Sequence, residues 1–313
     1  MIAVDPGLVA FGFAVGLLVG MTGIGGGSLM TPLLILVFGV KPVIAVGTDL
    51  AYGALTKTLG GYKHWRQRTV DARLSGWMAL GSVPAAIGGV WVLDALQRSH
   101  GGNIDGLLLK ILAGALLVTG AATLARALFL KQLVARERAE IRLGRGQKAA
   151  AVVLGAAVGF VLGLTSAGSG ALIAVGLILV FQLVPTRVVG TDVFHAAILL
   201  WAAALAHLVA GNVDFGLAAT ILLGSLPGVW IGSHCSTRVP TGALRTTLAV
   251  LLIGSGFALL SKTGVAVPAL ALAAVPLLVA AIVVAAVHGE RRKRRPAPEP
   301  PAVPWAGALR QEP

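Results

Sequence analysis

The chain has 313 residues, of which 57% are hydrophobic and 12% charged, and its mean hydropathy is +0.89. A soluble globule of this size needs more charged residues to cover its surface, so the composition indicates a membrane protein. The formal net charge is +13, but 17 of the 25 Lys and Arg residues fall in three short runs, 57–73, 126–148 and 291–295. Such clustering is typical of loops beside a membrane, and we expect a lipid bilayer and no nucleic acid as partner.

Metal and redox chemistry find little support in the sequence. Cys235 is the only cysteine, so it cannot form an internal disulfide and has no partner for a metal cluster. The glycine-rich stretches lack the Lys of a phosphate loop and the complete GxGxxG of a dinucleotide site. We therefore expect no metal and no cofactor.

Apolar segments bounded by Gly, Pro or charged residues follow one another along the chain. They fall at roughly 7–21, 28–40, 43–60, 74–93, 107–130, 149–163, 170–184, 188–209, 215–234, 244–260 and 266–288. The segment 28–40 is shorter than the roughly 20 residues of a full span, which favours a half-helix or re-entrant piece. No basic region precedes 7–21, so we expect a retained helix there and no cleaved signal. The predicted fold class is an all-α, polytopic integral membrane protein with broken or re-entrant helices.

An internal duplication with an offset of 143 residues organises these segments. Aligning 16–89 with 159–232 without a gap gives 26 identities in 74 positions. The copies share a glycine-rich stretch, which reads Thr22-Gly-Ile-Gly-Gly-Gly-Ser28 in the first and Thr165-Ser-Ala-Gly-Ser-Gly-Ala171 in the second. Because the register holds over several segments, the chain consists of two copies of one unit.

The two units are expected to have opposite orientations in the membrane. The first two segments of a unit leave the chain on the side where it started and the next three cross, so each unit crosses an odd number of times. The result is a pair of inverted repeats. The positive-inside rule agrees, since placing 61–73 in the cytoplasm puts 126–148 and 289–295 there too, with the N-terminus outside and the C-terminus cytoplasmic.

This organisation predicts five regions. They are a first transmembrane repeat (1–130), a cytoplasmic linker (131–147), a second transmembrane repeat (148–265), an extra C-terminal transmembrane helix (266–288) and a basic, Pro-rich, disordered tail (289–313).

The two glycine-rich stretches are the first candidate site. Helix breakers at membrane depth leave backbone groups unpaired, so two matched breaks predict a cavity, and the helix N-termini that follow favour an anion. The alternative is that these small residues only allow close helix packing. The candidate substrate-binding residues are Thr22, Gly23, Gly25, Gly26, Gly27, Thr48, Thr165, Ser166, Gly168, Ser169, Gly170 and Thr191.

Two carboxylates form the second candidate site. Asp49 and Asp192 lie on the order of 10 Å inside helices that begin at Pro42 and Pro185, a depth at which ionisable groups point to function. His195 lies one helical step beyond Asp192 on the same face. We expect a role in proton coupling for these three residues, with the alternative that the carboxylates cap neighbouring helices.

Lys57 is the one cation well within an apolar segment, and its counterpart in the second repeat is Leu200. Two interpretations are open. Lys57 lines an inward anion path as part of a gate, or its ammonium group reaches the lipid headgroups.

Taken together, the run Gly20-Met-Thr-Gly-Ile-Gly-Gly-Gly-Ser-Leu-Met-Thr-Pro32, the following Val46-Gly-Thr48 and their repetition resemble the TauE/SafE sulfite exporter family, also called toluene sulfonate uptake permeases. The resemblance covers about residues 7–260. It implies a bacterial inner-membrane protein that moves sulfite, sulfonates or related sulfur-containing organic anions.

We therefore expect a secondary transporter of small sulfur-containing or carboxylate anions, with or without protons, in which one repeat rocks against the other. A passive anion channel is the main alternative. An intramembrane serine protease of the rhomboid type is a further one, because Ala167-Gly-Ser169-Gly170, with His195 or His207 nearby, nearly matches a Gly-x-Ser-Gly motif. The duplication explains that stretch without a nucleophile, so we expect no enzyme.

Overall fold

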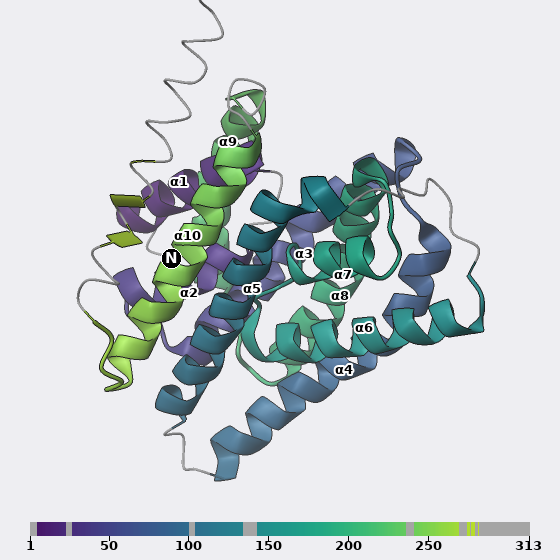
Figure 1. Ribbon diagram of the computed structural model, residues 1–313. Helices are drawn as coiled ribbons and strands as arrows, with labels where there is room; N and C mark the ends of the chain where they lie inside the picture. The colour runs from purple at the N-terminus through teal and green to yellow at the C-terminus, as the bar shows by residue number, and fades with distance from the viewer. Residues whose placement is uncertain are drawn as a thin grey trace, which may run out of the picture.

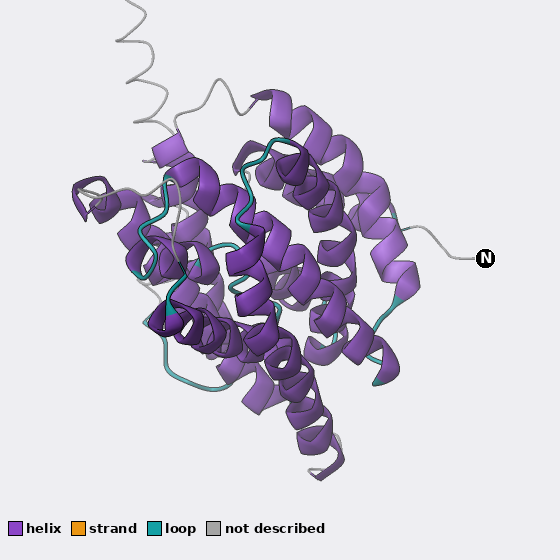
Figure 2. Ribbon diagram, turned by 90° about the vertical axis from the view of Figure 1, so that its right-hand side faces the viewer, coloured by secondary structure: helices purple, strands orange, loops and turns teal. Residues whose placement is uncertain are grey.

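The computed structural model describes residues 5–22, 27–99, 104–133, 143–235 and 241–268, together with 274, 275, 277, 278 and 281. This part of the chain is α-helical and contains no β-strand (Figure 2). Its helices are α1 (Pro6–Thr22), α2 (Gly27–Val37), α3 (Pro42–Arg66), α4 (Ala72–Ser99), α5 (Asp105–Leu133), α6 (Arg145–Thr165), α7 (Leu172–Leu179), α8 (Pro185–Val209), α9 (Phe215–Cys235) and α10 (Thr241–Lys262).

Within the described part, six helices are long and apolar enough to cross a membrane, namely α4, α5, α6, α8, α9 and α10. The all-α, polytopic fold class is thus confirmed. Helix α2 has 11 residues and α7 has 8, so both are short, as expected for half-helices. The predicted tail at 289–313 lies outside the described residues, and so do most of the predicted extra helix at 266–288 and much of the linker.

The two halves pack on each other through glycines. Helix α1 lies against α9, and α4 lies against α6, as the latter pair shows along the lower right of Figure 1. In both crossings a Cβ on the glycine would collide with a backbone carbonyl of the partner helix. The pairs are Gly12 with Ile221, Gly16 with Ser225 and Gly20 with Val229, and then Gly155 with Met78, Gly159 with Ser82 and Gly163 with Ala86.

These crossings are related by the offset of the duplication. Gly12 and Gly155 are matching positions, and so are Ile221 and Met78, so the contact recurs with the roles of the halves exchanged. Each half therefore presents the same packing surface to the other. The opposite membrane orientation of the repeats, which rests on the crossing count, stays a prediction.

Helices α3 and α8 pack against each other at the centre, and a pair formed by α5 and α10 lies beside them (Figure 1). Each central helix is tied to the other half by a threonine. Thr48 Oγ1 accepts a hydrogen bond from the Asp214 backbone N–H at 3.0 Å, and Thr191 Oγ1 accepts one from the Asp71 N–H at 2.9 Å. These two bonds are also related by the offset, and they hold the starts of α9 and α4 against the central helices.

Candidate functional site

The second glycine-rich stretch is a buried helix break. Helix α6 ends at Thr165, Ser166 has φ 57° and Gly168 has φ +106°. The Ala167 N–H donates to Thr165 Oγ1 at 3.2 Å, which satisfies one backbone group that the break leaves free. The chain resumes a helix only at Leu172, and every residue of the break is buried. Non-helical backbone at such a place needs surrounding protein or a cavity, and the cavity itself stays a prediction.

Asp49 joins this break to the first half of the chain. The carboxylate is 1% exposed, and its Oδ2 accepts hydrogen bonds from Thr31 Oγ1 at 2.6 Å and from Ser166 Oγ at 2.7 Å. The three side chains come from α2, α3 and the α6–α7 break. Bonds to a charged acceptor are stronger than those between neutral groups. Asp49 therefore ties the half-helix of one repeat to the broken helix of the other.

The other oxygen of Asp49 is free for further chemistry. Its Oδ1 is buried and has no hydrogen-bond partner among the described residues. A buried polar atom without a partner costs free energy, so such atoms mark places where a proton, a water or a ligand binds.

The first glycine-rich stretch lies mainly outside the described residues, which exclude Gly23, Gly25 and Gly26. Its flanks are described, since α1 ends at Thr22 and α2 begins at Gly27. The helix ends thus bracket the predicted break.

The remaining predicted substrate residues divide into two groups. Thr165, Ser169 and Gly170 lie in the buried break with Ser166. Thr48 and Thr191 do not join them, because their hydroxyl groups hold the loops before α9 and α4 as described above. Sequence alone could not separate these roles, since both threonines stand beside an intramembrane carboxylate.

Asp192 has different neighbours from Asp49. It is 7% exposed, and its Oδ1 has no hydrogen-bond partner in the part of the chain that is described. The positive charges of Lys57 and Arg126 act on it. Lys57 is itself 6% exposed, and its Nζ has no hydrogen-bond partner among the described residues. The Lys57 ammonium group is thus buried in the described part of the chain, and its role in an anion path or gate stays a prediction.

His195 is buried beside a different helix. Its Nε2 is 3.2 Å from Ser82 Oγ of α4. The counterparts of this pair, Tyr52 and Ser225, lie beside each other in the other half. His195 and Asp192 lie three residues apart on α8, and the hydrogen bond of His195 is to Ser82. Their shared role in proton coupling stays a prediction.

Sequence reasoning missed Thr31, which donates to Asp49, and also Arg126 and Arg245. Thr31 is one hydroxyl among several in an apolar helix, and Arg126 was counted with the basic run that begins there. In the structure, Arg126 lies within α5 and Arg245 lies in α10, both are partly buried, and the two helices pack against each other. Their only sequence signal was a position inside an otherwise apolar segment.

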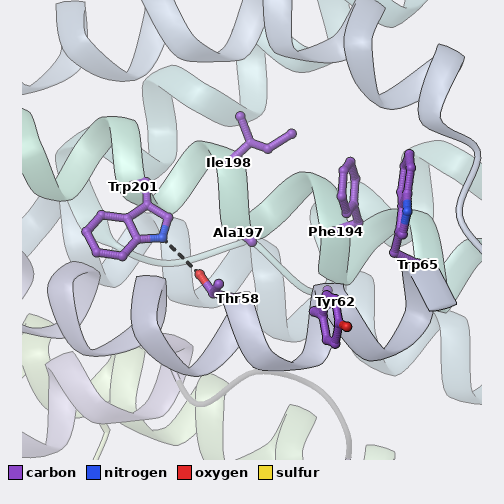
Figure 3. Close-up of a pocket in the computed structure, with 8 residues that line it drawn as sticks. Thr58, Tyr62, Trp65, Phe194, Ala197, Ile198 and Trp201 are labelled. Carbon is purple, nitrogen blue, oxygen red and sulfur yellow. Dashed lines mark hydrogen bonds between the residues drawn. The ribbon is translucent and has the colours of Figure 1, made fainter.

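A separate groove of about 510 Å³ lies between α3 and α8 (Figure 3). It is lined mainly by aromatic and aliphatic side chains, with Trp65 stacked on Phe194 at 5.1 Å between ring centroids. The Trp201 Nε1–H donates to Thr58 Oγ1 at 2.9 Å, which uses the polar groups of both side chains. This apolar groove offers an anion no charged partner.

No group of three or more His, Cys, Asp and Glu residues in the described part of the chain has the arrangement of a metal site. The protease alternative would pair Ser169 with His195 or His207. Ser169 lies in the break, whereas His195 contacts Ser82 and His207 Nε2 is 2.9 Å from the Gly163 carbonyl oxygen, so neither of these hydrogen bonds is to Ser169.

Comparison with known proteins gives one family. The family model described as "Sulfite exporter TauE/SafE" matches residues 8–259. The probable membrane transporter protein YjnA of Bacillus subtilis is 39% identical over 253 residues, which are 81% of this chain and 98% of that protein. YdhB of the same organism is 27% identical, covering 75% of this chain and 92% of its own, and is also described as a probable membrane transporter. No solved structure matches the chain significantly.

Proposed function

Because the chain belongs to the sulfite exporter TauE/SafE family, we propose that it carries sulfite, a sulfonate or a related sulfur-containing organic anion across the membrane. Membership of this family, together with the similarity to probable membrane transporters, identifies the chain as a multi-pass membrane transporter protein and not an enzyme. The substrate class, the coupling to protons and the orientation in a bacterial inner membrane are parts of this proposal.

The buried link from Asp49 to Ser166 is the observation that supports the proposal most. Because Asp49 of α3 also accepts a hydrogen bond from Thr31, the link connects the half-helix α2 to the broken helix of the other repeat. A motion of one repeat against the other would break or remake the hydrogen bond from Ser166 to Asp49, because it is the one of the two that joins the repeats. The site is thus suited to exposing an anion first to one side of the membrane and then to the other.

Proton coupling rests on the carboxylates. Asp49 and Asp192 each have one buried oxygen without a hydrogen-bond partner among the described residues, where a proton can bind without displacing an existing bond. Together with His195, they are the proposed coupling groups, and Lys57 is the proposed gate. Asn in place of either carboxylate removes the proton site while keeping the shape.

We expect a pH gradient to alter uptake by the wild type, and Asp49→Asn and Asp192→Asn to reduce that dependence. The measurement is uptake into vesicles with and without the gradient. If both variants respond to the gradient as the wild type does, the carboxylates do not couple transport to protons.

Reconstituted protein tests the proposal as a whole. Purified protein in proteoliposomes is supplied with radiolabelled sulfite, sulfoacetate, taurine or thiosulfate, and we expect uptake of at least one of them above that of empty vesicles. Counterflow separates the mechanisms, because a carrier preloaded with unlabelled anion accumulates the labelled one and a passive channel does not. Failure of every anion would remove the substrate class.

A further inference from the structure

Two packed helix pairs, α3 with α8 and α5 with α10, carry four charged side chains. We call them the basic cluster, and its members are Lys57 of α3, Arg126 of α5, Asp192 of α8 and Arg245 of α10. In the α3–α8 pair, Gly53 faces Leu200 and Gly60 faces Val193, which places Lys57 within about one helical turn of Asp192. In the α5–α10 pair, Gly120 faces Ala249 and Gly256 faces Leu117, which brings Arg126 level with Arg245. The electrostatic influence of Arg126 on Asp192 connects the two pairs.

The cluster has an excess of positive charge. It contains three cations, and Asp192 is the carboxylate that the structure describes beside them, so two positive charges are left over. Lys57 Nζ, Arg245 Nε and Asp192 Oδ1 are all buried without a hydrogen-bond partner among the described residues. Burying charges is costly unless they are paired and hydrogen-bonded. An anion bound here would accept hydrogen bonds from the free Lys57 and Arg245 donors and offset the surplus charge.

One face of α5 connects the cluster to the broken helix. Thr119 Oγ1 lies 3.7 Å from the position that a Cβ on Gly168 would take, and this hydroxyl oxygen is buried without a partner in the described part of the chain. Arg126 follows seven residues later, two helical turns along the same face, which is about 10 Å. Between them, the Thr123 hydroxyl group donates to the Thr119 carbonyl oxygen at 2.7 Å. Polar groups thus lead from the break to the cluster.

We propose that the basic cluster binds the transported anion, and that this anion is an oxyanion with two negative charges. The inference rests on the proposed function and names the site and the charge of its substrate. Two guanidinium groups suit an oxyanion because each presents a planar fork of donors, and the Lys57 ammonium adds a compact charge. A dianion balances the two surplus positive charges, whereas taurine, with no net charge, leaves them uncompensated.

The first test measures the KM for sulfoacetate in proteoliposomes. Lys57→Met and Arg126→Gln each remove one charged donor, so we expect the KM to rise about 10- to 100-fold. Lys110→Met is the matched control, because Lys110 lies on α5 with Arg126 but is exposed. Asp192→Asn removes the negative charge and should lower the KM by about fivefold. Opposite shifts for cation and carboxylate variants are not expected from general damage to the fold.

The second test needs no variant. Sulfoacetate, methanesulfonate and taurine carry net charges of about −2, −1 and 0, and we expect them to stabilise the purified wild-type protein against thermal unfolding in that order. Equal stabilisation by all three, or the best stabilisation by taurine, would overturn the inference.

The outcomes separate this inference from the proposed function. If the wild type transports sulfonates while Lys57→Met and Arg126→Gln keep its KM, the basic cluster is not the binding site and the function stands. If the wild type transports none of the sulfur anions, the proposed function fails and the inference fails with it.

Discussion

Asp49 and Asp192 occupy matching positions in the two halves but lie in opposite environments. Asp49 accepts hydrogen bonds from two hydroxyl groups, those of Thr31 and Ser166. At the offset of 143 residues, these donors correspond in sequence to Ala174 and Gly23, neither of which has a hydroxyl group. Asp192 is instead acted on by the charges of Lys57 and Arg126. Duplication supplied the same carboxylate twice, and substitutions around it made one a hydrogen-bonded link and the other a partner of cations.

The halves remain alike where they pack on each other. The glycine crossings of α1 with α9 and of α4 with α6 recur at the same offset, and so do the two threonine bonds to backbone N–H groups. A close backbone contact leaves no room for a side chain, so substitution there is restricted in both halves. Divergence is therefore found in the polar centre, where charge and hydrogen bonding can change without moving the helices.

The largest effect is expected at the glycine crossings, where the halves should respond equally. Gly81→Leu and Gly224→Leu place a side chain against the backbone oxygens of Val152 and Val9, and we expect both variants to lose the folded state. Size-exclusion chromatography in detergent measures this. Gly88→Leu on α4 is the control, because a Cβ there meets no atom within 4 Å, and it should leave the folded yield unchanged. If the Gly224→Leu variant folds and functions while Gly81→Leu does not, the two crossings are not equivalent.

A smaller effect is expected from the donors to Asp49. Thr31→Val and Ser166→Ala each remove a hydrogen bond to a buried carboxylate, which should lower the free energy of unfolding by about 1.5–3 kcal/mol. Thermal unfolding in detergent reports the loss. Thr220→Val is the matched control, since the Thr220 hydroxyl group donates within its own helix to the Gly216 carbonyl oxygen at 2.8 Å. If the control loses as much stability as Thr31→Val, the link to Asp49 has no special strength.

The smallest effect is expected at the threonine bonds that both halves share. Thr48→Val and Thr191→Val each remove one bond to a backbone N–H, and each should lower the free energy of unfolding by about 1 kcal/mol. The two losses should be equal within error in the same unfolding assay. A clear inequality would show that the halves differ in their packing as well as in their polar centre.

The sequence predicted the frame of this molecule well because the frame follows from hydrophobicity and repetition. The offset of 143 residues anticipated which residues match, and the apolar segments anticipated the helices, including the short α2 and α7. The break after Thr165 was also predicted, because glycine and small polar residues interrupt an apolar run there.

The partners of each carboxylate could not be predicted in the same way. Thr31 reaches Asp49 because α2 folds back on α3, and Ser166 reaches it from the other half of the chain. Arg126 and Arg245 approach each other only because α5 packs on α10. Contacts of this kind depend on helix crossings, which neither periodicity nor composition determines.

The most direct test of the division between the two carboxylates compares Asp49→Asn with Asp192→Asn in one sulfoacetate counterflow assay. Asp49→Asn should slow the maximal rate with little change in KM, because it alters the link between the halves and not the basic cluster. Asp192→Asn should lower the KM, because it removes the negative charge beside the cations. Identical shifts of rate and KM in the two variants would contradict the account, because they would mean that Asp49 and Asp192 have the same role in transport.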